Sequence, residues 1–197
     1  MIRRLMSVAV AGSLLAGMST GALAHPGHDD GHGLAAGVLH PLLGADHVLA
    51  MVAVGLIGAL RGGRAVWALP ATFLGMMVAG AGFGLLGVPL PYAEGAILAS
   101  VVLFGLLAIS SRRLPTVLLA GLIGAFAVFH GYAHVVEMPE NSSAVLFGLG
   151  FLAATAFLHA VGVAIGVFTS RTILGAKRTA ASSHRPLETL TPASDQN

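Results

Sequence analysis

The chain has 197 residues, of which 56% are hydrophobic and only 9% charged, and its mean hydropathy is +0.88. Soluble domains have about 25% charged residues, so this composition excludes an ordinary soluble enzyme. Cysteine is absent, which excludes disulfides, thiol catalysis and cysteine-ligated metal centres. The net charge of +2 does not indicate nucleic-acid binding, because the basic residues separate long apolar runs instead of clustering on one face. This layout is typical of a small multi-pass membrane protein.

The N-terminus has the pattern of a secretory signal peptide over residues 1–24. Arg3 and Arg4 form a positive region, and an apolar run from Leu5 to Gly17 follows. Ala22-Leu23-Ala24 then places small residues at the two positions that a signal peptidase reads. We expect cleavage after Ala24. An uncleaved first helix is the alternative, and it leaves the later topology unchanged.

Five apolar segments follow, at about residues 34–60, 65–87, 92–110, 114–135 and 144–169. Each reaches the length of about 20 residues that a helix needs to cross the bilayer core, and none alternates like a membrane β-strand. The sequence therefore predicts an all-α membrane protein, with a bundle of about five transmembrane helices over residues 34–171. Residues 172–197 are polar, and we expect a disordered tail there.

The basic residues of the loops predict the orientation of these helices. After the signal peptide they fall only in the first loop, the third loop and the C-terminal tail: Arg61, Arg64, Arg112, Arg113, Arg171, Lys177, Arg178 and Arg185. The positive-inside rule makes these segments cytoplasmic. We therefore expect a multi-pass protein of the bacterial inner membrane, with its N-terminus outside and its C-terminus in the cytoplasm.

Two GxxxG pairs, Gly80/Gly84 and Gly162/Gly166, lie in the second and fifth segments. Small residues allow close approach of helices in lipid. Packing within one bundle is the simpler interpretation, and the face of a homo-oligomer is the alternative.

Ionisable side chains within the predicted spans are costly in lipid and are candidates for function. They are His40, Asp46 and His47 in the first segment, His130 and His134 in the fourth, and His159 in the fifth. His130 and His134 are four residues apart, so both rings lie on one helix face. His40 and His47 are seven residues apart, close to two turns. Pro41 makes a re-entrant piece followed by a helix from about Leu42 an equal alternative.

The predicted topology places most of these groups in the outer half of the membrane, with His159 near mid-span. Three helices could then direct imidazoles and one carboxylate into a cavity that opens outside. Imidazole with carboxylate suits nickel, cobalt, zinc or copper. Asp46 is either a direct ligand or a partner that fixes the tautomer of a ligating histidine. Glu94, at the outer start of the third segment, is a candidate for receiving incoming ions, and a solvated carboxylate is the alternative.

If cleavage follows Ala24, the mature chain begins with a polar leader over residues 25–33. Its potential ligands are His25, His28, Asp29, Asp30 and His32. A short His-rich tract outside the membrane is a candidate for metal capture. A flexible polar leader is the alternative.

The segment from His25 to Gly55 resembles the HupE/UreJ family of small membrane proteins. The resemblance rests on the pattern His-Pro-x-x-Gly-x-Asp-His over residues 40–47, and it continues through His130-Gly131-Tyr132-Ala133-His134 and Leu158-His159. It implies a secondary permease that imports nickel or cobalt for nickel enzymes such as hydrogenase or urease. It also implies that the metal is cargo and not a permanent cofactor, and it assigns the site first to His40, Asp46 and His47.

Two other functions remain open on sequence grounds. Three histidines and a water can form a catalytic zinc site, so an intramembrane zinc hydrolase is one alternative, although no HExxH motif is present. A haem-b electron carrier with paired histidines is another, although Asp46 beside His47 suits a cation better. The chain contains no phosphate-binding loop of a P-loop ATPase. We therefore expect a transporter and not an enzyme, driven by the ion gradient, protons or the membrane potential.

Overall fold

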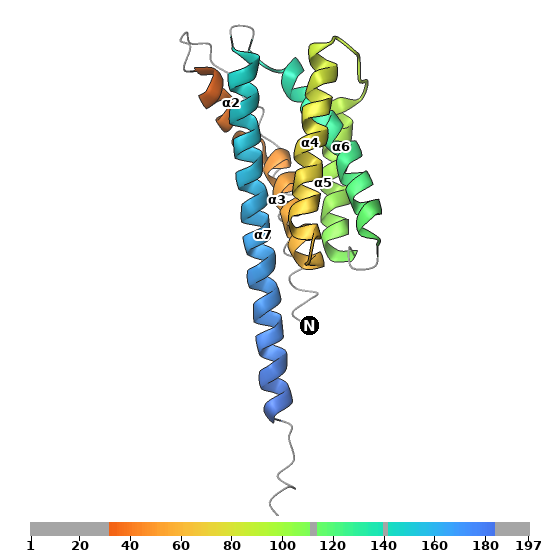
Figure 1. Ribbon diagram of the computed structural model, residues 1–197, viewed down its shortest axis with the longest axis vertical. Coiled ribbons are helices and arrows are strands. Elements are labelled where there is room, and N and C mark those ends of the chain that lie inside the picture. The colour runs from red at the N-terminus through yellow and green to blue at the C-terminus, as the bar shows by residue number, and fades with distance from the viewer. Residues whose placement is uncertain (1–31, 111–113, 140–141, 184–197) are drawn as a thin grey trace, which may run out of the picture.

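The computed structural model describes residues 32–110, 114–139 and 142–183, and over these residues every regular element is an α-helix (Figure 1). The helices are α2 (His32–Leu43), α3 (Ala45–Arg61), α4 (Ala65–Leu85), α5 (Ala93–Ser110), α6 (Thr116–Val136) and α7 (Ala144–Ser183). The predicted all-α class is confirmed. The predicted signal peptide, most of the leader and residues 184–197 lie outside the described residues.

Helices α4, α5, α6 and the part of α7 from Ala144 to Thr172 are each long and apolar enough to cross a membrane. They match the four later predicted segments to within a few residues. Helices α2 and α3 pass the same test only as a pair that is bent by 81°. The described residues therefore contain four helices that could span a membrane, or up to five crossings if the bent pair forms one span.

The bend bears out the alternative of a broken segment over residues 34–60 and not that of one continuous helix. The break lies at Gly44, whose φ of −87° and ψ of 112° are extended and not helical. Pro41, which that alternative placed at the break, lies inside α2. A proline inside a helix removes a hydrogen bond and crowds the carbonyl four residues earlier, but α2 continues past Pro41, and the extended backbone at Gly44 is what ends the helix and redirects the chain.

Helix α7 is 40 residues long, which corresponds to about 60 Å, twice the thickness of the bilayer core of about 30 Å. Figure 1 shows that it runs past the rest of the bundle at one end. The expected disordered tail from residue 172 is therefore wrong for residues 172–183, which are helical. This segment is polar, but it contains several Ala, Lys and Arg residues, which favour a helix in water as well.

Glycines allow the helices to pack backbone against backbone. A Cβ atom at Gly80 of α4 would overlap the carbonyl oxygen of Val128 in α6, and one at Gly162 of α7 would overlap that of Val52 in α3. The second glycine of each GxxxG pair also faces the same neighbouring helix. Both pairs are thus used for packing inside the bundle, as the simpler interpretation predicted.

The two ends of the bundle differ in charge. At the basic end, Arg61 closes α3 and Arg64 precedes α4, and Arg61 Nη2 donates a hydrogen bond of 2.8 Å to Thr116 Oγ1 at the start of α6. At the opposite end, α6 finishes and α7 begins (Figure 1). We call this opposite end the histidine end, because the histidines described next lie close to it.

Candidate metal centre

Four histidines and two carboxylates converge near the histidine end. We call these residues the histidine cluster: His40, Asp46, His47, His130, His134 and Glu137. The His47 ring centroid lies 4.6 Å from that of His134 and 5.6 Å from that of His130. The His40 centroid lies 4.9 Å from that of His134. The structure therefore brings together all of the site residues predicted in the first and fourth segments.

The bend between α2 and α3 allows His40 and His47 to share this site. Their ring centroids are 6.3 Å apart, whereas seven residues of continuous helix would separate the two positions by about 10 Å along the axis. Gly44 also leaves room for the side chains that follow it. A Cβ atom there would lie 2.6 Å from His47 Nδ1 and 3.0 Å from Asp46 Oδ1, so only glycine fits this arrangement without a shift.

Hydrogen bonds to oxygen atoms occupy one ring nitrogen of His47 and one of His130. His47 Nδ1 donates to Asp46 Oδ1 at 2.9 Å, and His130 Nδ1 donates to the Phe126 carbonyl oxygen at 3.0 Å. Because these oxygens only accept, each Nδ1 carries the proton and each Nε2 keeps its lone pair. Both Nε2 atoms are buried without a hydrogen-bond partner. This is the arrangement that prepares a histidine to ligate a metal.

His40, His134 and Glu137 form the second part of the cluster. Each offers a ligand atom, and the three atoms lie within 4.8 Å of one another. His40 Nε2 is 3.2 Å from Glu137 Oε2, and His134 Nδ1 is 4.0 Å from the same oxygen. Neither ring nitrogen of His134 has a hydrogen-bond partner. A cation bound here could take the place of the hydrogen bond between His40 and Glu137.

Glu137 is the cluster residue that the sequence analysis did not single out. A signal was present, because Glu137 follows His134 by three residues, the spacing at which two side chains meet on a helix surface. Its main partner is His40, 97 positions earlier in the chain. That contact depends on how α2 packs near the end of α6, which spacing alone does not give.

Exposure falls from the carboxylates to the histidines of α6. The side chains of Glu137, Asp46 and His40 are 45%, 43% and 30% exposed, whereas His134 is only 4% exposed and His130 is fully buried. Phe151 of α7 covers His134, with ring centroids 4.0 Å apart. The cluster thus has an acidic, accessible rim and a floor of buried imidazoles.

His159 and Glu94 lie apart from the cluster. His159 is 2% exposed, and its ring centroid lies 5.2 Å from that of Phe73, which in turn lies 5.3 Å from that of His130. Phe73 therefore contacts both His159 and the innermost histidine of the cluster. Glu94 is exposed on the first turn of α5, and no hydrogen bond or ion pair among the described residues joins it to the cluster. Of the predicted leader, His32 begins α2, and His25, His28, Asp29 and Asp30 lie outside the described residues.

Comparisons with known proteins cover most of the chain. A family model described as HupE / UreJ protein matches residues 13–184. The chain is also similar to Protein HupE of Rhizobium leguminosarum bv. viciae, with 43% identity over 143 residues, which are 72% of this chain and 74% of the relative. No solved structure matches the chain.

Proposed function

Because the chain belongs to the HupE/UreJ family, which is associated with nickel and cobalt transport, we propose that it imports nickel or cobalt ions through the histidine cluster. Membership of a transporter family, together with four or five apolar crossings, makes it a multi-pass membrane protein. The ion, the direction of transport and the site are the parts that we propose.

One observation carries the assignment of the site: the buried imidazoles of the cluster present ring nitrogens without partners. They are His47 Nε2, His130 Nε2 and both ring nitrogens of His134. Buried polar atoms are normally paired, and an unpaired one is costly. A divalent ion at the cluster would pair several of these nitrogens at once, and imidazole with carboxylate suits nickel and cobalt.

The two carboxylates take different roles in this proposal. Asp46 holds the His47 ring by accepting from its Nδ1, so it acts as a positioning residue that leaves Nε2 free for the ion. Glu137 stands at the rim within reach of both His40 and His134, so it acts as a ligand. Glu94 and the polar side chains of residues 25–33 gather incoming ions outside the membrane.

The charge difference between the two ends of the bundle supports import. The positive-inside rule puts the basic end with Arg61 and Arg64 in the cytoplasm of the inner membrane, so the histidine end opens outside. An inside-negative potential then drives a doubly charged ion inward by about 4.6 kcal/mol per 100 mV. This drive is sufficient for uptake without nucleotide hydrolysis.

Uptake of radiolabelled nickel into cells that express the chain tests the proposal, with cobalt, zinc and copper as competitors. We expect uptake by the wild-type protein and a loss of about 10- to 100-fold in a His47→Ala variant that inserts normally. A Phe168→Ala variant, changed at a side chain that is 73% exposed on α7, is the matched control and should transport normally. Normal uptake by His47→Ala would refute the site, and no uptake by correctly inserted wild-type protein would refute the function.

A further inference from the structure

His159 is the buried polar group that the cluster leaves unused. Neither of its ring nitrogens has a hydrogen-bond partner. Thr155, one turn earlier on α7, is fully buried and its hydroxyl oxygen is also without a partner. Because the two residues are four positions apart, they lie on the same face of α7. A buried imidazole and hydroxyl without partners indicate a place where a polar ligand is held.

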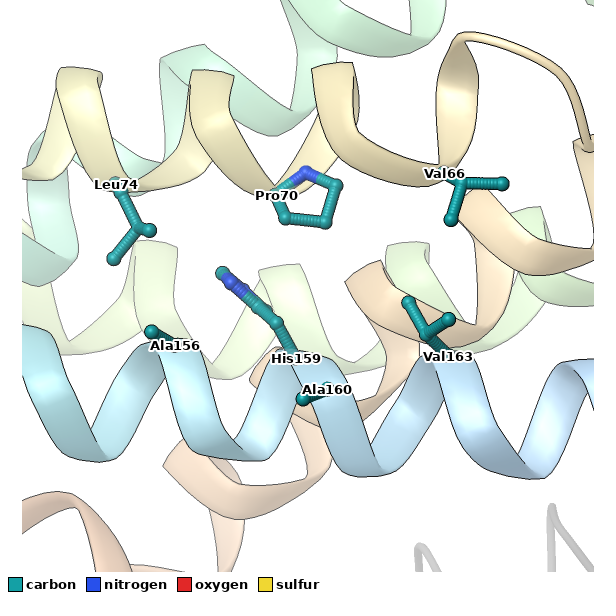
Figure 2. Close-up of a pocket in the computed structure, with 7 residues that line it drawn as sticks. All are labelled: Val66, Pro70, Leu74, Ala156, His159, Ala160 and Val163. Atoms are coloured by element: carbon teal, nitrogen blue, oxygen red, sulfur yellow. The ribbon is translucent and has the colours of Figure 1, made fainter.

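Beside His159 lies an apolar cleft between α4 and α7, with a volume of about 310 Å³. Figure 2 shows the His159 side chain pointing from α7 across the cleft toward α4, near Pro70 and Leu74. Since a water molecule takes up about 30 Å³ in the liquid, the cleft has room for an ion with several waters. His159 is the one side chain in its lining that can ligate a metal.

The cleft leads from His159 toward the basic end. Helices α4 and α7 run in opposite directions, and α4 starts at the basic end with Ala65 (Figure 1). Val66 and, facing it, Val163 therefore lie nearest the basic end, whereas Leu74 lies nearer the histidine end (Figure 2). An ion at His159 thus has open space on the side away from the cluster.

Pro70 leaves one carbonyl oxygen of α4 without its helical donor. Proline has no amide hydrogen, so the helical hydrogen bond to the carbonyl oxygen of Val66, four residues earlier, cannot form. Both residues line the cleft, and they lie on the same face of α4. The part of α4 that lines the cleft therefore has one carbonyl oxygen without its usual helical partner.

The Phe73 ring contacts both this place and the cluster. It is fully buried, and its contacts with His130 and His159 are both edge-on, with ring centroids 5.3 Å and 5.2 Å apart. His130 and His159 thus share one aromatic neighbour, which links the innermost histidine of the cluster with the cleft.

We propose that His159 forms an inner transit site for the ion that the histidine cluster receives, with Phe73 as the barrier between the two sites and the α4–α7 cleft as the way to the basic end. The inference rests on the proposed function. One imidazole with a carbonyl oxygen and water binds an ion more weakly than the cluster does. Weak binding suits this position, because conduction requires that an ion leave as readily as it arrives.

The test compares His159→Ala and His159→Gln in the full chain by two readouts: nickel uptake into cells, and Co²⁺ binding to the purified protein followed by its absorption spectrum. We expect uptake to fall about 10- to 100-fold, while the affinity of the cluster for Co²⁺ and the spectrum stay those of the wild type. His159→Gln keeps a polar side chain of similar size, so this variant should fold even if His159→Ala does not. Phe157→Ala, changed at a side chain that is 61% exposed two positions away, should behave as the wild type in both readouts.

The outcomes separate the two proposals. Normal uptake by both His159 variants would overturn the transit site. A loss of Co²⁺ binding at the cluster together with uptake would also overturn it, because His159 would then support the cluster and not act after it. If the wild-type chain itself takes up no nickel, the proposed function fails and the transit site fails with it.

A second measurement tests the cleft without changing His159. Since the chain contains no cysteine, a Val163→Cys variant offers one thiol at the end of the cleft nearest the basic end. A cationic, membrane-impermeant thiol reagent applied from the basic side should block uptake by this variant. It should leave uptake unchanged in Phe168→Cys, at a side chain on α7 that is 73% exposed. Full labelling of Val163→Cys with normal uptake would overturn the route through the cleft.

Discussion

The histidine cluster and the His159 cleft use the same chemical group in opposite surroundings. The cluster combines four imidazoles with two carboxylates and has an accessible acidic rim. The cleft presents one imidazole among apolar side chains, between α4 and α7. Many ligands make a site that captures an ion, and few ligands make a site that passes it on. In the route that we propose, the number of ligands, and not the burial of a histidine, separates capture from transit.

Replacing Asp46 with Asn should change the cluster most while leaving the cleft intact. The amide has the same shape, but its NH₂ group can donate to His47 Nδ1, which moves the ring proton to Nε2. The affinity for Co²⁺ should fall about 10- to 100-fold, toward the weak binding of a single free imidazole. Titration of the purified Asp46→Asn protein with Co²⁺ measures this loss. Wild-type affinity would show that Asp46 does not set the tautomer of His47.

Replacing Glu137 with Gln should have a smaller effect, because this carboxylate is 45% exposed and solvent screens its charge. We expect the nickel concentration for half-maximal uptake to rise about tenfold, at the lower end of the range for such partners. The Glu137→Asp variant keeps the charge and should recover part of the affinity. An unchanged concentration dependence in Glu137→Gln would remove Glu137 from the ligand set.

Replacing Gly44 with Ala should have the smallest effect. This variant tests whether the bend fixes the positions of the cluster side chains. The new methyl group would press on His47 Nδ1 and displace its pairing with Asp46. A displacement well below 1 Å should weaken Co²⁺ binding only about threefold and alter its absorption spectrum. Gly148→Ala on α7, where a Cβ atom has nothing within 4 Å, is the matched control. Identical spectra for both variants would show that the bend tolerates a side chain.

Hydropathy and spacing predicted the four long helices and the shared face of His130 and His134, because both features depend on neighbours along one helix. The break at Gly44 was harder to predict. Pro41 is the stronger breaker by residue type, yet the helix accommodates it, and the site needs the space at Gly44 instead. The contacts of the folded protein decide whether the helix is interrupted at Pro41 or at Gly44.

The relations between helices could not be predicted from the sequence. Hydropathy gives the depth of His159 in the membrane but not the direction it faces, which follows from the packing of α7 against α3 at glycines such as Gly55 and Gly162. Glu137 was missed for the same reason, since its partner His40 comes from a distant helix. The end of α7 was misjudged because a polar composition does not distinguish a helix in water from a disordered tail.

The ends of the helices around the cluster contribute an electrostatic field at the cluster. Helices α2 and α6 both finish there, with His40 and His134 in their last turns, whereas α3 begins there with Asp46 in its first turn. The last carbonyl groups of a helix act as about half a negative charge, and the first amide groups act as about half a positive charge. Helix α7 also begins at this end, so its positive end faces the same region. The carboxylate of Asp46 offsets the positive end of α3, and the last turns of α2 and α6 add negative partial charge beside His40 and His134, which favours a cation there.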